Sequence, residues 1–229
     1  MTDTATTASG DGSHWEHVYD SGQQLNRYPF EVVLSFVFSR FGKVPDRSKC
    51  RILEVGCGAG NNVWFLAREG FAAAGIDGSE SAVDYARERL KKDGLSADLR
   101  VGDFGKLPWE DRVFDAVIDR GAITHNRRAN IEATLDEIKR VLKPGGLFLS
   151  QFFSDLDGGK PYGRDLGDGC YSDFTEGYFK DLGYTFFADR TLVDDLFGSR
   201  FEIVSREHVT FDREKAVNRA AFWNLICKA

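Results

Sequence analysis

Apolar positions along the middle of the chain fall into two alternating patterns. Short, nearly continuous apolar runs predict buried strands, and they stand at residues 51–55, 71–76, 97–101, 114–118 and 147–153. Apolar residues spaced three and four apart predict helices between these runs, at residues 61–69, 79–92 and 130–142. Strands that alternate with helices are typical of an α/β fold, in which helices cover both faces of a mostly parallel sheet.

The flanking segments extend this pattern. Before it, residues 28–41 show the spacing of an amphipathic helix, with Pro29 in its first turn and Gly42 at its end. Three further elements are expected near the C-terminus: a helix at residues 191–197 and strands at 201–211 and 222–227.

Residues 1–13 are rich in Thr, Ser, Gly and Asp, which predicts a disordered tail. They have neither the basic nor the apolar region of a signal peptide. Residues 14–229 are expected to form a single domain, of which 14–47 are an N-terminal cap segment.

A long segment, residues 154–190, interrupts the regular alternation after the fifth predicted strand. It is rich in glycine and holds several tyrosines, namely Tyr162, Tyr171, Tyr178 and Tyr184. Segments of this length between elements are commonly lids or binding loops, so we predict an insert that covers the substrate, with a helix at residues 173–182. The alternative is a surface excursion that only covers the sheet.

Composition narrows the possible partners. The net charge of −6 argues against sequence-independent binding of nucleic acid, which needs a basic face. No apolar run approaches the roughly 20 residues that span a bilayer. The cysteines (Cys50, Cys57, Cys170 and Cys227) form no C-x-x-C pair, and this fits a reducing compartment such as the cytoplasm.

The clearest motif follows the first predicted strand. The sequence Glu54-Val-Gly-Cys-Gly-Ala-Gly60 ends a strand in a glycine-rich turn that opens a helix, a position where ligands bind in parallel sheets. Asp77 ends the second strand, where a carboxylate can accept hydrogen bonds from ribose hydroxyls. A dinucleotide-binding loop is the alternative, but its third glycine would stand at position 61, which is Asn61.

With its later motifs, the sequence resembles the class I methyltransferases that use S-adenosylmethionine. The matching segments are Glu54–Gly60, Asp77, Gly102-Asp103, Phe114–Asp119 and the Leu-Lys-Pro-Gly-Gly turn at 142–146. The resemblance implies a Rossmann-like, doubly wound sheet of seven strands, mostly parallel, with the last strand antiparallel. It also implies an N-terminal cap helix and places the insert after strand five.

The resemblance further implies a cofactor site for S-adenosylmethionine, which the reaction converts to S-adenosylhomocysteine. Glu54 would fix the glycine loop, Asp77 would hold the ribose, Asp103 and the Phe104 amide would bind adenine, and Arg120 would lie near the methionine end. The full expected set is Glu54, Gly56, Cys57, Gly58, Gly60, Asn61, Asp77, Gly78, Ser79, Gly102, Asp103, Phe104 and Arg120.

Methyl transfer requires a positioned nucleophile, and a base only when the acceptor carries a tightly held proton. His125 is the candidate base, since a neutral imidazole can take up a proton near physiological pH; otherwise it is a surface histidine. Arg127 and Arg128 either bind an anionic group of the substrate or mark a solvated helix entrance.

Substrate contacts are expected from two parts of the chain. The cap segment offers Trp15, Tyr19, Arg27 and Tyr28, and strand five with the insert offers Gln151, Phe153, Tyr162 and Tyr171. The aromatic residues of the cap either stack on the substrate or anchor the cap by packing.

Asp155 and Asp157 stand where metal-dependent relatives place carboxylates, but the accompanying Asp-Asn pair has no match, so no metal is expected. The predicted function is methylation of a small molecule, most plausibly at an oxygen of a sugar or secondary metabolite. The alternative is a non-catalytic module that binds S-adenosylmethionine. No nucleic-acid or membrane partner is expected, and the sequence leaves monomer and homodimer open.

Overall fold

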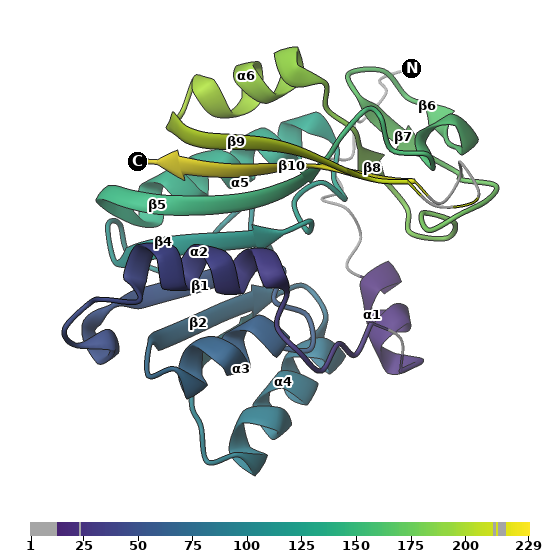
Figure 1. The fold of residues 1–229 in the computed structure, drawn as a ribbon. Helices are drawn as coiled ribbons and strands as arrows, with labels where there is room; N and C mark the ends of the chain where they lie inside the picture. The colour runs from purple at the N-terminus through teal and green to yellow at the C-terminus, as the bar shows by residue number, and fades with distance from the viewer. Residues whose placement is uncertain (1–12, 23, 213, 215–218) are drawn as a thin grey trace, which may run out of the picture.

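A seven-stranded sheet forms the centre of the molecule (Figure 1). The computed structural model describes residues 13–22, 24–212, 214 and 219–229. The strands follow the spatial order β3-β2-β1-β4-β5-β10-β9. Their bounds are β1 Arg51–Val55, β2 Ala72–Asp77, β3 Asp98–Val101, β4 Phe114–Arg120, β5 Leu142–Phe153, β9 Glu202–Phe211 and β10 Ala220–Lys228.

The pairing of these strands confirms the predicted fold class. β1, β2, β3, β4 and β5 pair in parallel, whereas β10 is antiparallel to both β5 and β9. The chain runs outward from β1 to β3 and then returns to place β4 on the other side of β1. In such sheets the loops after the two central strands diverge, and the crevice that they leave is the usual ligand site.

Helices cover both faces of the sheet. On one side lie α2 Glu31–Phe41, α3 Asn61–Arg68 and α4 Glu80–Lys92, and on the other α5 Arg128–Val141 and α6 Arg190–Gly198 (Figure 1). Alternate residues of a strand pack into the apolar cores on the two faces of the sheet. In β1, Ile52 packs toward α2 and α3, and Leu53 packs toward α5. This two-faced burial explains why the strands read as continuous apolar runs.

Two predicted helices differ from the structure. The helix expected at 28–41 begins only at Glu31, because Phe30 has an extended backbone and acts as its N-cap, so Pro29 lies before the first turn. The helix expected at 173–182 is wrong. Asp173, Gly177 and Asp181 have positive φ angles of 52°, 83° and 63°, which a right-handed helix does not accommodate.

The insert instead folds around a small sheet and an aromatic cluster. Its strands are β6 Arg164–Asp165, β7 Cys170–Ser172 and β8 Thr185–Phe186, and a short 3-10 helix, η2, spans Lys160–Tyr162. A second such turn, η1, spans Arg47–Lys49 before β1. Phe174 and Phe179 pack with Phe153 and Phe187, so the apolar residues that suggested a helix are buried from an irregular backbone.

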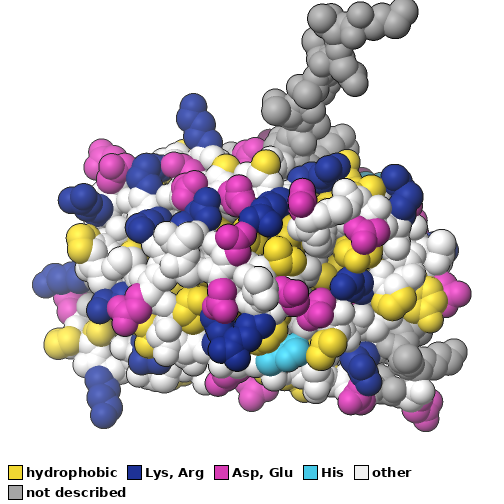
Figure 2. All heavy atoms as spheres, turned by 90° about the horizontal axis from the view of Figure 1, so that it is seen from above, with side chains coloured by type: hydrophobic (Ala, Val, Ile, Leu, Met, Phe, Trp, Pro, Cys, Tyr) yellow, Lys and Arg dark blue, Asp and Glu magenta, His cyan; other side chains and the backbone are white. Residues whose placement is uncertain are grey.

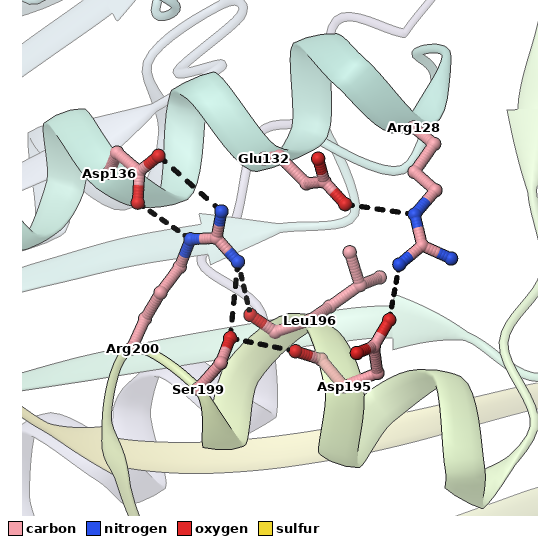
Figure 3. A network of polar contacts seen from close by, with 7 residues as sticks. All are labelled: Arg128, Glu132, Asp136, Asp195, Leu196, Ser199 and Arg200. Carbon is pink, nitrogen blue, oxygen red and sulfur yellow. Dashed lines mark hydrogen bonds and ion pairs between the residues drawn. The ribbon is translucent and has the colours of Figure 1, made fainter.

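A polar network joins α5 to α6 on the side of the sheet away from α2 (Figure 3). Arg128 forms ion pairs with Glu132, at 2.8 Å, and with Asp195. Arg200 pairs with Asp136 at 2.6 Å and also donates to the carbonyl of Leu196. The guanidinium of Arg128 is therefore paired with two carboxylates of the protein itself, Glu132 and Asp195.

Charges of both signs are interspersed over the face of the molecule seen from above in Figure 2. This mixture differs from the single basic stripe by which proteins bind a phosphate backbone. Within the described parts of the chain, no helix combines the length and the apolar character needed to cross a membrane. The tail expected at 1–13 lies almost wholly outside the described residues, apart from Ser13, which begins α1.

Candidate active site

A cavity of about 560 Å³ opens where β1, β2 and β4 end. Its walls include most residues of the predicted cofactor set: Glu54, Gly56, Cys57, Gly58, Asn61, Asp77, Gly78, Gly102, Asp103, Phe104 and Arg120. Gly60 and Ser79 do not line it. Gly60 is the N-cap of α3, and Ser79 is the N-cap of α4, where its Oγ accepts a hydrogen bond from the Ala82 amide.

The glycine loop after β1 approaches its neighbours too closely for side chains. A Cβ on Gly56 would lie 2.1 Å from the Cβ of Ala122, and one on Gly58 would lie 2.3 Å from the hydroxyl of Tyr19. Both glycines also have positive φ angles, of 65° and 48°. The loop therefore presents bare backbone to the cavity.

Asp77 fixes the same loop from the end of β2. One carboxylate oxygen accepts a hydrogen bond from the Gly58 amide at 2.8 Å, and the other accepts one from the Ser79 amide at 3.0 Å. Burial raises the pKa of Asp77, while these amide donors act in the opposite direction. Each oxygen retains a lone pair that can accept from a ligand hydroxyl.

Two buried polar atoms at the floor of the cavity have no hydrogen-bond partner among the described residues: Glu54 Oε2 and Arg120 Nε. The other Glu54 oxygen accepts from Asn62 Nδ2 at 2.6 Å, and the Arg120 guanidinium lies 3.7 Å from the centre of the Phe30 ring. Burial raises the pKa of Glu54 to about 8 and lowers that of Arg120.

These orphaned groups fit a ligand that carries an ammonium and a carboxylate. An unpaired buried polar group is costly, and a ligand that pairs it removes this cost. The amino-acid end of S-adenosylmethionine has both complementary groups. The donor set therefore fits the cofactor that the sequence motifs imply.

Asp119, near the end of β4, fixes the turn that follows this strand. Its Oδ1 accepts from the amides of Ala122 and Ile123, at 2.8 and 3.1 Å, and its Oδ2 accepts from Ser150 Oγ at 2.9 Å. Burial raises its pKa to about 6. The carboxylate holds the turn that presses Ala122 against Gly56, although sequence reasoning assigned it no role.

Helix α1, Ser13–Asp20, covers the cavity from the side of α4 and brings Trp15 and Tyr19 into its lining. Glu16 anchors it, accepting hydrogen bonds from Ser79 Oγ at 2.6 Å, from the Ser81 amide at 3.3 Å and from Ser81 Oγ. A carboxylate is favoured at the N-terminus of α4 because the helix dipole is positive there. Sequence reasoning missed Glu16, since no local signal pairs it with residues so distant in the chain.

We expect Glu16→Ala to loosen α1 by about 0.5–1 kcal/mol, the usual value of a carboxylate at a helix N-terminus. Hydrogen bonds from Ser79 and Ser81 lower the pKa of Glu16, so its contribution is present above its unfolded pKa and lost as the pH falls. Amide exchange of residues 13–20 should therefore accelerate in the variant at pH 7. Asp20→Ala, an exposed carboxylate on the same helix, is the control and should leave the exchange unchanged.

His125 lines the cavity and is buried, and its amide donates to the carbonyl of Ala122, which packs against Gly56 of the glycine loop. Its Nδ1 is 3.2 Å from the carbonyl oxygen of Tyr184, which can only accept, so we assign the proton of the neutral ring to Nδ1. The Thr185 hydroxyl lies 3.3 Å from the same nitrogen. The rings of Trp15 and Phe153 pack against the imidazole, with centroids 5.2 and 5.7 Å away. His125 is thus part of the site rather than a surface histidine.

The structure places several predicted substrate residues away from the cavity lining. Tyr28 is 70% exposed, and Arg27 stacks on its ring outside the cavity. Gln151 faces a neighbouring groove beneath α2 and donates to Asn224. Phe153 is buried behind His125.

The insert contributes different tyrosines from those expected. The Tyr171 hydroxyl donates to Asp165, and Tyr162 lies in the turn before β6. Tyr178, Leu182 and Tyr184 line the cavity instead. Arg127 lies outside the lining, 5.6 Å from the Tyr184 ring.

Carboxylates after β5 have structural partners. Asp157 accepts hydrogen bonds from the amides of Gly159 and Ala221. Over the ranges that the structure describes, His, Cys, Asp and Glu side chains form no cluster that could hold a metal ion.

Known proteins share both this sequence core and this fold. Residues 52–146 match the model of a methyltransferase domain family. A fatty-acid O-methyltransferase of Mycolicibacterium smegmatis is 34% identical over 128 residues, which are 55% of this chain and 43% of that protein. A sterol 24-C-methyltransferase of Gibberella zeae is 39% identical over 101 residues, 43% of this chain and 26% of that one. The chain thus spans less than half the length of either relative.

A solved structure shows the likeness over nearly the whole chain. The 1,6-didemethyltoxoflavin-N1-methyltransferase of Burkholderia thailandensis has a TM-score of 0.71 at 16% identity, covering 95% of this chain and 86% of that one. With the motifs and the cavity, these findings show that residues 52–146 resemble a methyltransferase domain and that the chain shares the fold of S-adenosylmethionine-dependent methyltransferases.

Proposed function

We propose that this protein transfers a methyl group from S-adenosylmethionine to an oxygen atom of a small molecule. The observation that carries the proposal is that Glu54 Oε2 and Arg120 Nε, both buried beside the glycine loop, have no hydrogen-bond partner among the residues that the structure describes. The relatives are named as C- and O-methyltransferases, so the choice of oxygen rests on His125.

The roles of the residues follow from their positions. Bound S-adenosylmethionine would supply an electrophilic methyl group together with its own leaving group. Glu54 and Arg120 would bind its amino-acid end, Asp77 its ribose, and Asp103 with the Phe104 amide its adenine. Helix α1 and the insert would exclude water from the reacting centre. His125 would accept the proton that the acceptor loses, through Nε2, the basic nitrogen of its assigned tautomer.

Calorimetry with S-adenosylhomocysteine tests the cofactor site. We expect Asp77→Ala to weaken binding by about 1–3 kcal/mol, the cost of leaving ribose hydroxyls unpaired. Asp84→Ala, an exposed carboxylate on α4, should bind as the wild type does. Unchanged affinity in Asp77→Ala would contradict its role.

Transfer itself is tested by incubating the protein with methyl-labelled S-adenosylmethionine and a metabolite extract. Label in a small-molecule product, lost in Asp77→Ala, supports the enzyme. Binding without transfer to any component would instead support a non-catalytic binding module.

A further inference from the structure

The charged residues in the described lining of the cavity come from the ends of the strands. Glu54, Asp77, Asp103 and Arg120 stand at or just after the carboxyl ends of strands, where the cofactor is proposed to bind. The rest of the lining comes from the cap segment, the turn after β4 and the insert. Its described residues include no Lys, Arg, Asp or Glu. An ionised acceptor would lose its hydration there without gaining a counter-charge, which is costly.

Aromatic residues from two segments line the cavity outside these strand ends. Helix α1 contributes Trp15 and Tyr19, whose centroids are 6.4 Å apart, and the insert contributes Tyr178 and Tyr184. Tyr19 also borders the glycine loop, since a Cβ on Gly58 would lie 2.3 Å from its hydroxyl, so an acceptor packed on this ring lies next to the proposed cofactor site. Aromatic side chains bind a flat ring by offset stacking and by edge-to-face contacts.

His125 lines the same cavity, and its imidazole is held by a hydrogen bond and by ring contacts. Its Nδ1 faces the Tyr184 carbonyl, and the rings of Trp15, Phe153 and Phe179 surround its imidazole. A neutral imidazole is a weak base, so it matches a hydroxyl on an aromatic ring better than the much less acidic hydroxyl of a sugar.

Building on the proposed methyl transfer, we infer that the acceptor is an uncharged, planar aromatic compound with a ring hydroxyl, bound against the rings of Trp15, Tyr19, Tyr178 and Tyr184. The hydroxyl oxygen forms the new bond to the methyl carbon while the carbon–sulfur bond breaks and its electron pair stays on sulfur. The hydroxyl proton passes to His125 Nε2 and then to water. The products are an aryl methyl ether and S-adenosylhomocysteine.

Initial rates with labelled S-adenosylmethionine test this inference, using 1-naphthol and 2-naphthol as probes, with 2-naphthoate and 1-decanol for comparison. We expect label in the naphthols and at least tenfold lower kcat/KM with the naphthoate or the alcohol. Equal or faster methylation of the naphthoate or the decanol would overturn the inference, as would no transfer to either naphthol.

Variants separate the two ends of the site. Trp15→Leu and Tyr184→Leu should each raise the KM for the naphthol about tenfold while changing the Kd of S-adenosylhomocysteine less than twofold. Tyr162→Leu, an insert tyrosine outside the cavity, should change neither. His125→Gln should lower kcat and remove the rise of rate with pH that a titrating base produces. If S-adenosylhomocysteine does not bind the wild type, the proposed function fails; if it binds but these variants leave KM unchanged, only the acceptor inference fails.

Discussion

Replacing Glu54 with Gln is expected to stabilise the unliganded protein at high pH and, at the same time, to weaken cofactor binding. Burial raises the pKa of Glu54 to about 8, so the folded state holds a proton that the unfolded state releases above about pH 4.5. Between these two values the folded protein binds more protons, and the free energy of unfolding therefore falls as the pH rises. The uncharged amide removes this loss.

Chemical denaturation at pH 5.5 and pH 8.5 measures the effect. Relative to the wild type, the variant should gain stability between these pH values, by roughly 1 kcal/mol for each pH unit that lies between the unfolded and the folded pKa of Glu54. Its affinity for S-adenosylhomocysteine should fall by about 1.5–3 kcal/mol, the value of a hydrogen bond to a charged group. Glu88→Gln, exposed on α4, is the control. Parallel pH profiles for the wild type and Glu54→Gln would contradict the assignment.

The second large effect is expected at Gly56. Gly56→Ala places a Cβ 2.1 Å from the Cβ of Ala122, a short side chain that cannot rotate away, at a φ of 65°. The left-handed backbone costs about 1–2 kcal/mol, and overpacking adds about 1–3 kcal/mol. The free energy of unfolding should therefore fall by roughly 2–5 kcal/mol.

Two other glycines separate these contributions. Gly70 has a φ of 86° but open space around its Cβ position, so Gly70→Ala should show the backbone cost alone. Gly78 has neither feature, and Gly78→Ala should unfold like the wild type. If Gly56→Ala lowers the free energy of unfolding no more than Gly70→Ala does, then the contact with Ala122 does not constrain the loop.

The sheet and the residues that line the cavity at the strand ends were predictable because local rules dictate them. Continuous apolar runs mark strands buried on both faces, and the glycines of the loop after β1 mark backbone that must approach its neighbours closely. Asp77 follows from its place at the end of β2. These features need no knowledge of distant contacts.

The part of the cavity lined by the insert was less predictable, because the positions of its side chains depend on an irregular backbone. The sequence pattern cannot distinguish Tyr162 and Tyr171 from Tyr178 and Tyr184, since the insert orients them through turns with non-glycine residues such as Asp173 at positive φ. The hydrogen bonds of Glu16 could not be predicted from the sequence either, because their donors lie at the start of α4, far from Glu16 along the chain.

The two covers of the cavity come from opposite sides of the strand-rich core: α1 precedes β1, and the insert follows β5. If the proposed roles hold, selectivity for the acceptor and affinity for the cofactor are encoded in separate stretches of the gene. Mutation would then remodel one without disturbing the other, and transplanting both covers onto a related sheet would offer a modular route to retargeting the reaction.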